Sequence, residues 1–423
     1  LGGTGAGNYT LAASTAQGAG RITPKQLNLA LAGGARFDKT YDGTANVAQS
    51  LTKDGNYTLT NFVNGEGADI ALAPVTGTYT DKNAGTGKTV TFGGLTLTGT
   101  GAGNYTLDKT TLTGKGTIAR CALTLGAVAA QSKTYDGNTL ADASKFGAVL
   151  NNVVAGDSVT AAATGATYND KNVAGASRIN YTGVVLAGAD AGNYTLAATT
   201  AQGAGTISRR TLTVDAVKEQ SKTYDGNTAA DTSKFQATLG NLVAGEENLV
   251  AATAAGAAYN DKNVAGANAV GYTGVALRGT GAGNYTIADT AQGAGTITRR
   301  ALTLGAVAAQ TKTYDGTTGA DASKFGATLN NAAAGDSVAA TAAGAAYNDK
   351  NVAAANRIDY TGVALAGADA GNYTLAATAA QGTGSITHRD LTLTADAQSI
   401  VQGEALPSFT GRAEGFADGE DER

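Results

Sequence analysis

One block of about 90 residues is repeated four times in this chain, and this repetition constrains the fold more than any other feature. Each copy has Lys-Thr-Tyr-Asp-Gly near its start and Ala-Gly-Asn-Tyr-Thr near its end. The tyrosines of the first motif are Tyr41, Tyr135, Tyr224 and Tyr314, and those of the second are Tyr9, Tyr105, Tyr194, Tyr285 and Tyr373. A solenoid coil is shorter than this block, whereas about 90 residues can close a hydrophobic core. We therefore expect each copy to fold as a domain.

The composition favours an all-β protein that does not bind nucleic acid. The chain has 60 Gly and only three Pro, and Val, Ile, Thr and Tyr are spread evenly along it. A net charge of −4 with 15% charged residues provides no basic face for a nucleic acid. The sequence contains no run of apolar residues long enough for a membrane-spanning helix. A single Cys excludes a disulfide framework.

Alternating apolar and hydroxyl residues predict the strands of one copy, residues 120–209. We expect about seven strands, two of them around Val159–Tyr168 and the others at Ala122–Leu125, Gln131–Tyr135, Arg178–Leu186, Tyr194–Ala198 and Gly205–Ser208. Asp136-Gly137 and the polar stretch 169–172 predict turns. Helical character is confined to Asp142–Phe146, where a single turn would place Phe146 inward.

Seven short strands with regular turns predict an immunoglobulin-like β-sandwich in each copy. Asp190-Ala191-Gly192-Asn193-Tyr194 has the spacing of a tyrosine corner, in which the hydroxyl bonds back to upstream backbone. Two other copies have Thr100 and Thr280 in place of that Asp. Leu196 stands where antibody domains have a Cys, so we expect apolar packing there instead of a disulfide.

Consecutive copies follow one another without a linker, as at Ser208–Leu212, so we expect restricted hinges. With strands of about ten residues, each domain would span roughly 30–40 Å, and four would form an extended rod of roughly 120–160 Å. The predicted boundaries are 1–23 for the closing strands of a truncated preceding repeat, 24–119, 120–209, 210–299 and 300–389 for repeats 1 to 4, and 390–423 for the start of a truncated further module. The chain is thus expected to be part of a longer protein.

The sequence predicts no catalytic, cofactor-binding or metal-binding residues. Cys121 stands where other copies have Arg, and so does His388, so both are single-copy replacements at repeat junctions. We expect them to be solvated junction residues and not a nucleophile and its base. The glycine runs Gly99–Gly103 and Gly279–Gly283 each precede a strand, so they lack the helix N-terminus of a phosphate loop and are predicted to be turns.

Two further hypotheses concern charged residues in turns and strands. Asp136, Asp170 and Asp190 lie in predicted turns where calcium could gather carboxylates, although ordinary turn bonding also explains them. Lys133 shares a strand face with Tyr135, as Lys39, Lys222 and Lys312 do with their tyrosines. A Lys–Asn isopeptide crosslink with Asn193 would need such a lysine, and a snorkelling Lys at the sheet margin is the simpler interpretation.

Every Asn-x-Ser/Thr sequon in the chain is an Asn-Tyr-Thr. The acceptor asparagines are Asn8, Asn56, Asn104, Asn193, Asn284 and Asn372. Such an Asn can carry a glycan if it is exposed and the cell has the transferase. An Asn after Gly is also typical of a tight corner, which is the interpretation we favour.

The ordered motifs resemble the YDG-type repeats of very large secreted bacterial adhesins, including filamentous-haemagglutinin-like proteins of two-partner secretion systems. In repeat 2 the matching segments are Lys133–Gly137, Tyr168–Val173, Asp190–Leu196 and Gly205–Ile207. Gln402–Pro407 resembles the opening of the MBG module that often neighbours such repeats. The resemblance implies a non-enzymatic stalk, at the bacterial cell surface or secreted, that holds an adhesive region away from the cell and supports attachment or biofilm cohesion.

Two alternatives to a spacer remain. A glycan-binding module would need an exposed aromatic platform, whereas most Tyr residues here fall at positions expected to be buried. A binder of ice, mineral or another host or abiotic surface is suggested by Thr-rich strands such as Leu95–Thr98, but it needs a flat, regular Thr face that domains joined with twist would interrupt. Strand edges and repeat ends also predict self-association into filaments.

Overall fold

The computed structural model describes residues 1–422 and is all-β. The chain forms two compact units, Leu1–Ser208 and Arg209–Arg423. The first contains repeats 1 and 2, and the second contains repeats 3 and 4 followed by residues 390–422. Among the described residues, no helix has the length and apolar character needed to cross a bilayer.

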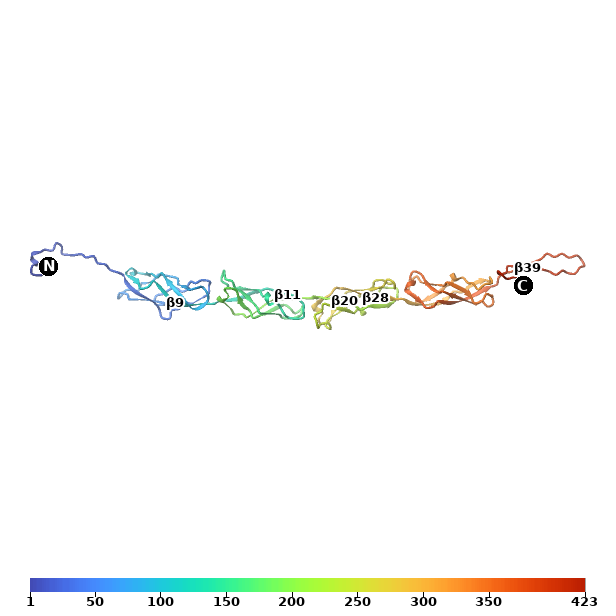
Figure 1. The fold of residues 1–423 in the computed structure, drawn as a ribbon, viewed down its shortest axis with the longest axis horizontal. Coiled ribbons are helices and arrows are strands. Elements are labelled where there is room, and N and C mark those ends of the chain that lie inside the picture. The colour runs from blue at the N-terminus through green and yellow to red at the C-terminus, as the bar shows by residue number, and fades with distance from the viewer. Residues whose placement is uncertain (423) are drawn as a thin grey trace. The chain divides into compact units, whose positions relative to one another are not determined.

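The strands of the first unit fall into two sets, one for each repeat. Repeat 1 has β1 (Lys25–Leu31), β2 (Lys39–Thr40), β3 (Tyr57–Thr60), β4 (Ala71–Leu72), β5 (Thr78–Tyr79), β6 (Gly85–Gly93), β7 (Leu97–Thr98), β8 (Tyr105–Leu107) and β9 (Thr111–Ala119). Repeat 2 has β10 (Cys121–Val128), β11 (Gln131–Thr134), β12 (Ala148–Asn151), β13 (Thr160–Ala162), β14 (Gly165–Tyr168), β15 (Arg178–Thr182), β16 (Val185–Ala187), β17 (Tyr194–Leu196) and β18 (Thr200–Ser208). Figure 1 labels β9 in the first repeat and β11 in the second.

The strands of the second unit repeat this pattern. Repeat 3 has β19 (Arg210–Thr211), β20 (Thr213–Val217), β21 (Gln220–Thr223), β22 (Ala237–Gly240), β23 (Ala251–Thr253), β24 (Gly256–Tyr259), β25 (Ala269–Thr273), β26 (Ala276–Arg278), β27 (Tyr285–Thr286) and β28 (Thr290–Thr298). Repeat 4 has β29 (Arg300–Val307), β30 (Gln310–Thr313), β31 (Ala327–Asn330), β32 (Ala339–Thr341), β33 (Gly344–Tyr347), β34 (Arg357–Thr361), β35 (Ala364–Ala366), β36 (Tyr373–Leu375) and β37 (Ala379–Thr387). β38 (Thr392–Ala395) and β39 (Gly411–Glu414) form a hairpin after repeat 4.

Short 3₁₀ turns occur at two places in the repeats. The turns before the phenylalanines are Ala143–Lys145, Thr232–Lys234 and Ala322–Lys324, and those within the Ala-Gly-Asn-Tyr motif are Ala6–Asn8, Ala102–Asn104, Ala191–Asn193, Ala282–Asn284 and Ala370–Asn372. The predicted turn in repeat 2 is confirmed: the Asp142 carboxylate accepts a hydrogen bond from the Ser144 amide at 2.9 Å and caps it. Phe146 follows the turn and packs on Tyr181, with ring centroids 4.7 Å apart.

Each repeat is an immunoglobulin-like β-sandwich, as predicted. In repeat 2 one sheet has the order β11-β18-β15-β14, and the other contains β12-β10-β17 with the β13-β16 pair beside it. The first two strands lie in different sheets: β10 runs parallel to β17, and β11 runs parallel to the last strand, β18. Only two residues separate β10 from β11, so the chain passes directly from one sheet of the sandwich to the other at the start of the repeat.

Three details of the predicted strands were wrong. Repeat 2, which the structure describes in full, has nine strands instead of about seven, since β12 was missed and the strand predicted at Arg178–Leu186 is two strands. Gly183 separates β15 from β16 with φ +62°, a left-handed conformation that ends the ladder. Residues 1–23 contain the 3₁₀ turn Ala6–Asn8 and no strand, because the predicted closing strands have no sheet edge in the described residues on which to pair.

Candidate functional site: the joints between repeats

In each unit, the two signature motifs of the sequence meet across the joint between consecutive repeats. In the first unit, Tyr41 of Lys-Thr-Tyr-Asp-Gly in repeat 1 donates a hydrogen bond to Asp157 Oδ2 of repeat 2, at 2.8 Å. Tyr194 of Ala-Gly-Asn-Tyr-Thr donates to the same oxygen at 2.6 Å. The two tyrosine rings lie edge to face, with centroids 5.4 Å apart.

A buried amide forms the second half of this joint. Asn193 Oδ1 accepts a hydrogen bond from the Ala84 backbone amide at 2.9 Å, and its Nδ2 donates to Asn83 Oδ1 at 3.3 Å. Asn83 and Ala84 belong to the Asp-Lys-Asn turn of repeat 1. The Asn193 side chain therefore recognises that turn through both a donor and an acceptor, and the residue is only 5% exposed.

The second unit contains the same joint between repeats 3 and 4. Tyr224 and Tyr373 donate to Asp336 Oδ2 at 2.8 and 2.6 Å, and their rings lie 5.3 Å apart. Asn372 accepts from the Val264 amide and donates to Asn263 Oδ1, both at 2.9 Å. Since two pairs of repeats with different sequences form the same contacts, the joint is a built feature of the fold.

The carboxylate of each joint is presented by a short acidic turn, in which the acid's amide bonds to the carbonyl three residues earlier. Residues 1–422 contain such turns at Val63–Glu66, Val154–Asp157, Val243–Glu246, Ala333–Asp336, Val401–Glu404 and Ala417–Glu420. The residue before each acid is a Gly with φ between +83° and +98°. The first residue of the turn packs on the Gly of the preceding Tyr-Asp-Gly: a Cβ on Gly43 would lie 2.7 Å from Val154 Cγ1.

The apolar core continues through each joint. In the first unit one hydrophobic cluster includes Tyr41 and Leu27 of repeat 1 together with Leu123 and Tyr194 of repeat 2. Only Arg120 separates β9 from β10, and only Arg299 separates β28 from β29. Within each unit, neighbouring repeats thus share packed side chains and directly connected strands.

Burial and charge set the ionisation of the joint. Burial, followed by the hydrogen bond to Asp157, raises the pKa of both Tyr41 and Tyr194 to about 12. The Tyr194 hydroxyl and, more weakly, the Tyr41 hydroxyl and Lys82 hold the pKa of Asp157 below its usual value. Lys82 Nζ lies 3.4 Å from Asp157 Oδ1, whose side chain is 4% exposed. The joint therefore contains a carboxylate bound by two neutral phenols and one ammonium.

The lysine of Lys-Thr-Tyr-Asp-Gly organises its own loop. Lys133 Nζ donates to Asp136 Oδ1 at 2.7 Å and to the carbonyls of Asn138 and Leu140 at 2.9 and 3.0 Å, and it lies over the Tyr168 ring. Lys39, Lys222 and Lys312 make the corresponding bonds. Lys133 and Asn193 share no partner, so the structure does not bring together the pair considered for an isopeptide crosslink.

The remaining candidates have local structural surroundings. Cys121 begins β10 and is half-buried, and His388 is exposed after β37. Gly99–Gly103 and Gly279–Gly283 run into three-residue 3₁₀ turns followed by strands, as predicted.

The three turn aspartates considered for calcium each bond to a different group. Asp136 accepts from Lys133, Asp170 from the Asn172 amide, and Asp190 from the Ser158 amide. Within residues 1–422, no three His, Cys, Asp or Glu side chains gather in a metal-binding arrangement.

The Tyr194 hydroxyl bonds to upstream backbone, as expected for the corner: it accepts from the Val154 amide at 3.0 Å, 40 residues upstream. It also donates to Asp157, which the sequence did not predict. The sequence reasoning missed the acidic turn, although a Gly followed by Asp or Glu recurs at the same place in each repeat and could have revealed it. Among the sequon asparagines, Asn193, Asn284 and Asn372 are buried and Asn8 and Asn104 are exposed.

The fold and its joints define a tandem array of immunoglobulin-like β-sandwich repeats. The chain belongs to the YDG domain family, which matches residues 23–112, 118–201, 208–292 and 298–380. No match is found among curated proteins.

Several solved multidomain structures are similar to the chain at low TM-score. Drosophila N-cadherin EC1-4 has 9% identity and a TM-score of 0.23, with 84% of this chain and 98% of that chain covered. Sidekick-1 immunoglobulin domains 1–5 have 8% identity and a TM-score of 0.22, with 85% and 80% covered. The I9–I11 tandem from titin has 8% identity and a TM-score of 0.21, with 63% and 99% covered.

Proposed function

We propose that this chain is a non-enzymatic stalk of a bacterial adhesin, exposed at the cell surface or secreted, which extends an adhesive region and supports attachment or biofilm cohesion. The four YDG matches support this proposal, together with the resemblance of the sequence motifs to the repeat regions of filamentous-haemagglutinin-like adhesins. Self-association of such stalks would add to cohesion.

The observation that carries the proposal is the Asp157 oxygen shared by Tyr41 and Tyr194, repeated at Asp336 in the other unit. Rotating one repeat on its neighbour would remove the Tyr41 and Lys82 contacts of Asp157, which would keep its bond from Tyr194. It would also leave the buried Asn193 amide without its partners in repeat 1. Leaving such groups without partners costs about 1–3 kcal/mol each. Each joint therefore favours a single orientation of one repeat on its neighbour, and a stiff spacer requires such fixed orientations.

The described side chains suit a structural role better than glycan binding or catalysis. Most tyrosines of the repeats, including Tyr135, Tyr181 and Tyr360, are buried in the sandwiches and offer no stacking platform for sugars. The turn carboxylates are engaged by backbone amides and lysines of their own loops. We propose that the chain has no active centre of its own.

Small-angle scattering of the full chain tests the stalk. We expect an elongated particle with a maximum dimension of at least roughly 120–160 Å, from four sandwiches of about 30–40 Å each. A compact profile would overturn the proposal. A glycan array with the same protein should give no specific binding, and reproducible binding to one sugar class would favour the glycan-binding alternative. Protease treatment of intact producing cells should remove the repeats if they are displayed at the surface.

A further inference from the structure

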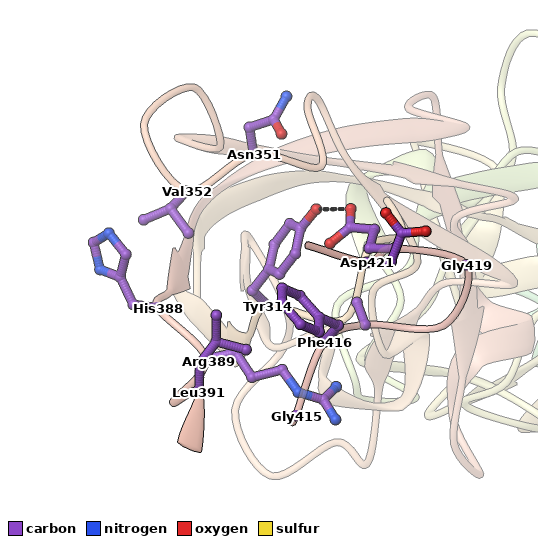
Figure 2. Close-up of a pocket in the computed structure, with 12 residues that line it drawn as sticks. Tyr314, Asn351, Val352, His388, Arg389, Leu391, Gly415, Phe416, Gly419 and Asp421 are labelled. Atoms are coloured by element: carbon purple, nitrogen blue, oxygen red, sulfur yellow. Dashed lines mark hydrogen bonds between the residues drawn. The ribbon is translucent and has the colours of Figure 1, made fainter. Parts of the chain in front are cut away.

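The C-terminal face of repeat 4 holds an acidic turn from the segment that follows it. Figure 2 shows Tyr314 of the fourth Lys-Thr-Tyr-Asp-Gly motif, with a dashed line for the hydrogen bond that its hydroxyl donates to the Glu420 carboxylate. Lys350 Nζ lies 3.7 Å from Glu420 Oε1. Tyr41 and Lys82 contact Asp157 in the same way at the joint between repeats 1 and 2.

The backbone of this turn matches the turns at the other joints. The Glu420 amide donates to the Ala417 carbonyl at 3.0 Å, as the Asp157 amide does to Val154 at 3.1 Å. Gly419 has φ +85°, compared with +94° for Gly156 and +89° for Gly335. The match covers the hydrogen bond that closes the turn and the left-handed conformation of its Gly, while the acid is Glu in place of Asp.

The packing of the turn on repeat 4 also matches. A Cβ on Gly316 would lie 3.2 Å from Ala417 Cβ, and one on Gly226 would lie 3.3 Å from Ala333 Cβ. Ala417 is only 3% exposed, although the segment around it is mostly exposed. Ala417 therefore occupies the place that Ala333 occupies at the joint between repeats 3 and 4.

The segment 390–423 nevertheless differs from a YDG repeat. It contains no Lys-Thr-Tyr-Asp-Gly and no Ala-Gly-Asn-Tyr motif, and none of the four family matches extends past residue 380. Beside the docked turn lies a cavity of about 650 Å³ lined by Tyr314, Asn351, Val352, His388 and Leu391, among others. Asn351 and Val352 correspond to Asn263 and Val264, which bind Asn372 at the joint in the same unit. The acidic half of the joint is thus formed without the asparagine half.

We propose that the C-terminal face of a YDG repeat is a docking site for an acidic turn of the following module, whether or not that module is a YDG repeat. The recognised element is a small or β-branched apolar residue, then a residue of any type, a Gly in the left-handed conformation, and Asp or Glu. Tyr and Gly of the repeat bind it through the phenol and the close backbone approach. The Lys ammonium also contacts the acid at Asp157 and at Glu420. Residues 417–420 dock the segment 390–423 on repeat 4 in this way.

A double-mutant cycle in the full chain tests the docking. Tyr314→Phe and Glu420→Gln are made singly and together, and hydrogen exchange is followed by mass spectrometry in peptides covering residues 414–421. Each single change should speed exchange there by roughly five- to tenfold, since a hydrogen bond to a charged group is lost. The double change should add little, because both changes remove the same contact.

Glu404→Gln is the matched control, since it removes the same charge from a turn of the same backbone form, Val401–Glu404, whose four residues are all exposed. It should leave exchange at 414–421 unchanged. Peptides within the repeats report whether the sandwiches remain folded in every variant. The proposal is overturned if Glu420→Gln behaves like Glu404→Gln, or if the effects of Tyr314→Phe and Glu420→Gln simply add.

An exchange of turns tests whether recognition is independent of the module type. Ala334→Asp with Asp336→Glu converts the acidic turn of repeat 4 into the sequence of the 417–420 turn. We expect exchange protection in β36 and around Asn372 to be retained, whereas Asp336→Asn should reduce it several-fold. Equal loss in both variants would show that the two turns are not interchangeable and would contradict the proposal. Neither outcome depends on whether the whole chain serves as a stalk.

Discussion

Tyr41 and Tyr194 belong to consecutive repeats, yet they donate to one and the same oxygen of Asp157 and pack edge to face across the joint. Asp157 lies in the same repeat as Tyr194. In repeat 1 the equivalent pair, Tyr105 and Glu66, is hydrogen-bonded in the same way. The tyrosine and acid of one repeat thus form a preorganised pair, and the tyrosine of the preceding repeat binds to it. Preorganisation reduces the conformational entropy lost on docking.

Replacing Asp157 should weaken the first joint more than any other single polar change there. Asp157→Asn keeps the shape but loses the charge that two phenols and Lys82 contact, so we expect a loss of about 1–3 kcal/mol in the unfolding free energy of the first unit. Urea unfolding measures this effect. Asp69→Asn, at an exposed position of the same unit, should change stability by less than about 0.5 kcal/mol. Equal effects of the two changes would contradict the assigned role of Asp157.

Alkaline pH should weaken the same joint. The pKa of Tyr41 and of Tyr194 is about 12 in the folded protein, against 10.0 for an ordinary tyrosine. Between these values the unfolded chain has released protons that the folded joint retains, so stability is complete below pH 10 and falls as the pH rises toward 12. Tyr41→Phe should make this decline shallower. An unchanged slope would show that Tyr41 does not contribute.

Acid should weaken the joint through Asp157. Its pKa in the folded protein is lower than usual, chiefly because of the Tyr194 hydroxyl. The folded state therefore binds fewer protons than the unfolded state near the ordinary aspartate pKa of about 3.9, and the stabilisation present above that pH is lost below it. Urea midpoints of wild type and Asp157→Asn should converge as the pH falls below about 3.9. A constant difference down to pH 2 would argue against this titration.

Gly43 should tolerate no side chain. Its φ of +80° is unfavourable for other residues, and an added Cβ would lie 2.7 Å from Val154 Cγ1. We expect Gly43→Ala to destabilise the first unit by about 1–3 kcal/mol. Gly192→Ala is the control in the same joint, since a Cβ there has no atom within 4 Å and the φ is not left-handed. Thermal unfolding of the two variants distinguishes a specific packing requirement from a general sensitivity of the joint.

Glycan attachment should follow the exposure of the sequons. Asn8 and Asn104 are exposed, whereas Asn193 and Asn372 are buried with both ends of the amide hydrogen-bonded to the preceding repeat. In a cell with an N-glycosyltransferase that acts on folded protein, we expect glycopeptides from Asn8 or Asn104 and none from the buried Asn193, Asn284 and Asn372. Modification of Asn193 in folded protein would show that the first joint opens.

The sandwich could be predicted from the sequence because its signals are local. The alternation at Ala122–Leu125 and the cap-like Asp142 before Phe146 specify their own structure within a few residues. The joint could not be predicted in this way, since Tyr41 and Asp157 are 116 residues apart. A comparison of the four copies matches each position with its equivalent in the other copies. The joint instead brings together two positions that are not equivalent, Tyr41 of one copy and Asp157 of the next. The acid also alternates between Asp and Glu, and the spacing that predicts a bond from Tyr194 to upstream backbone gives no sign of its second bond, to Asp157.

Removing the lysine of the Tyr-Asp-Gly loop should destabilise a repeat from within. Lys133 Nζ satisfies the Asp136 carboxylate and two backbone carbonyls, and its side chain is 17% exposed. Lys133→Met keeps much of the apolar stem but leaves these acceptors without their donor, so we expect a loss of about 2–3 kcal/mol. Lys145→Met, at an exposed position of the same repeat, should have little effect.

The intact mass of the wild-type protein should show no loss of ammonia from a Lys–Asn crosslink. Lys133 bonds to groups of its own loop, whereas Asn193 bonds to the Asp-Lys-Asn turn of repeat 1. A deficit of one ammonia per repeat would instead place these lysines in covalent crosslinks, and Lys133→Met would then remove one of them.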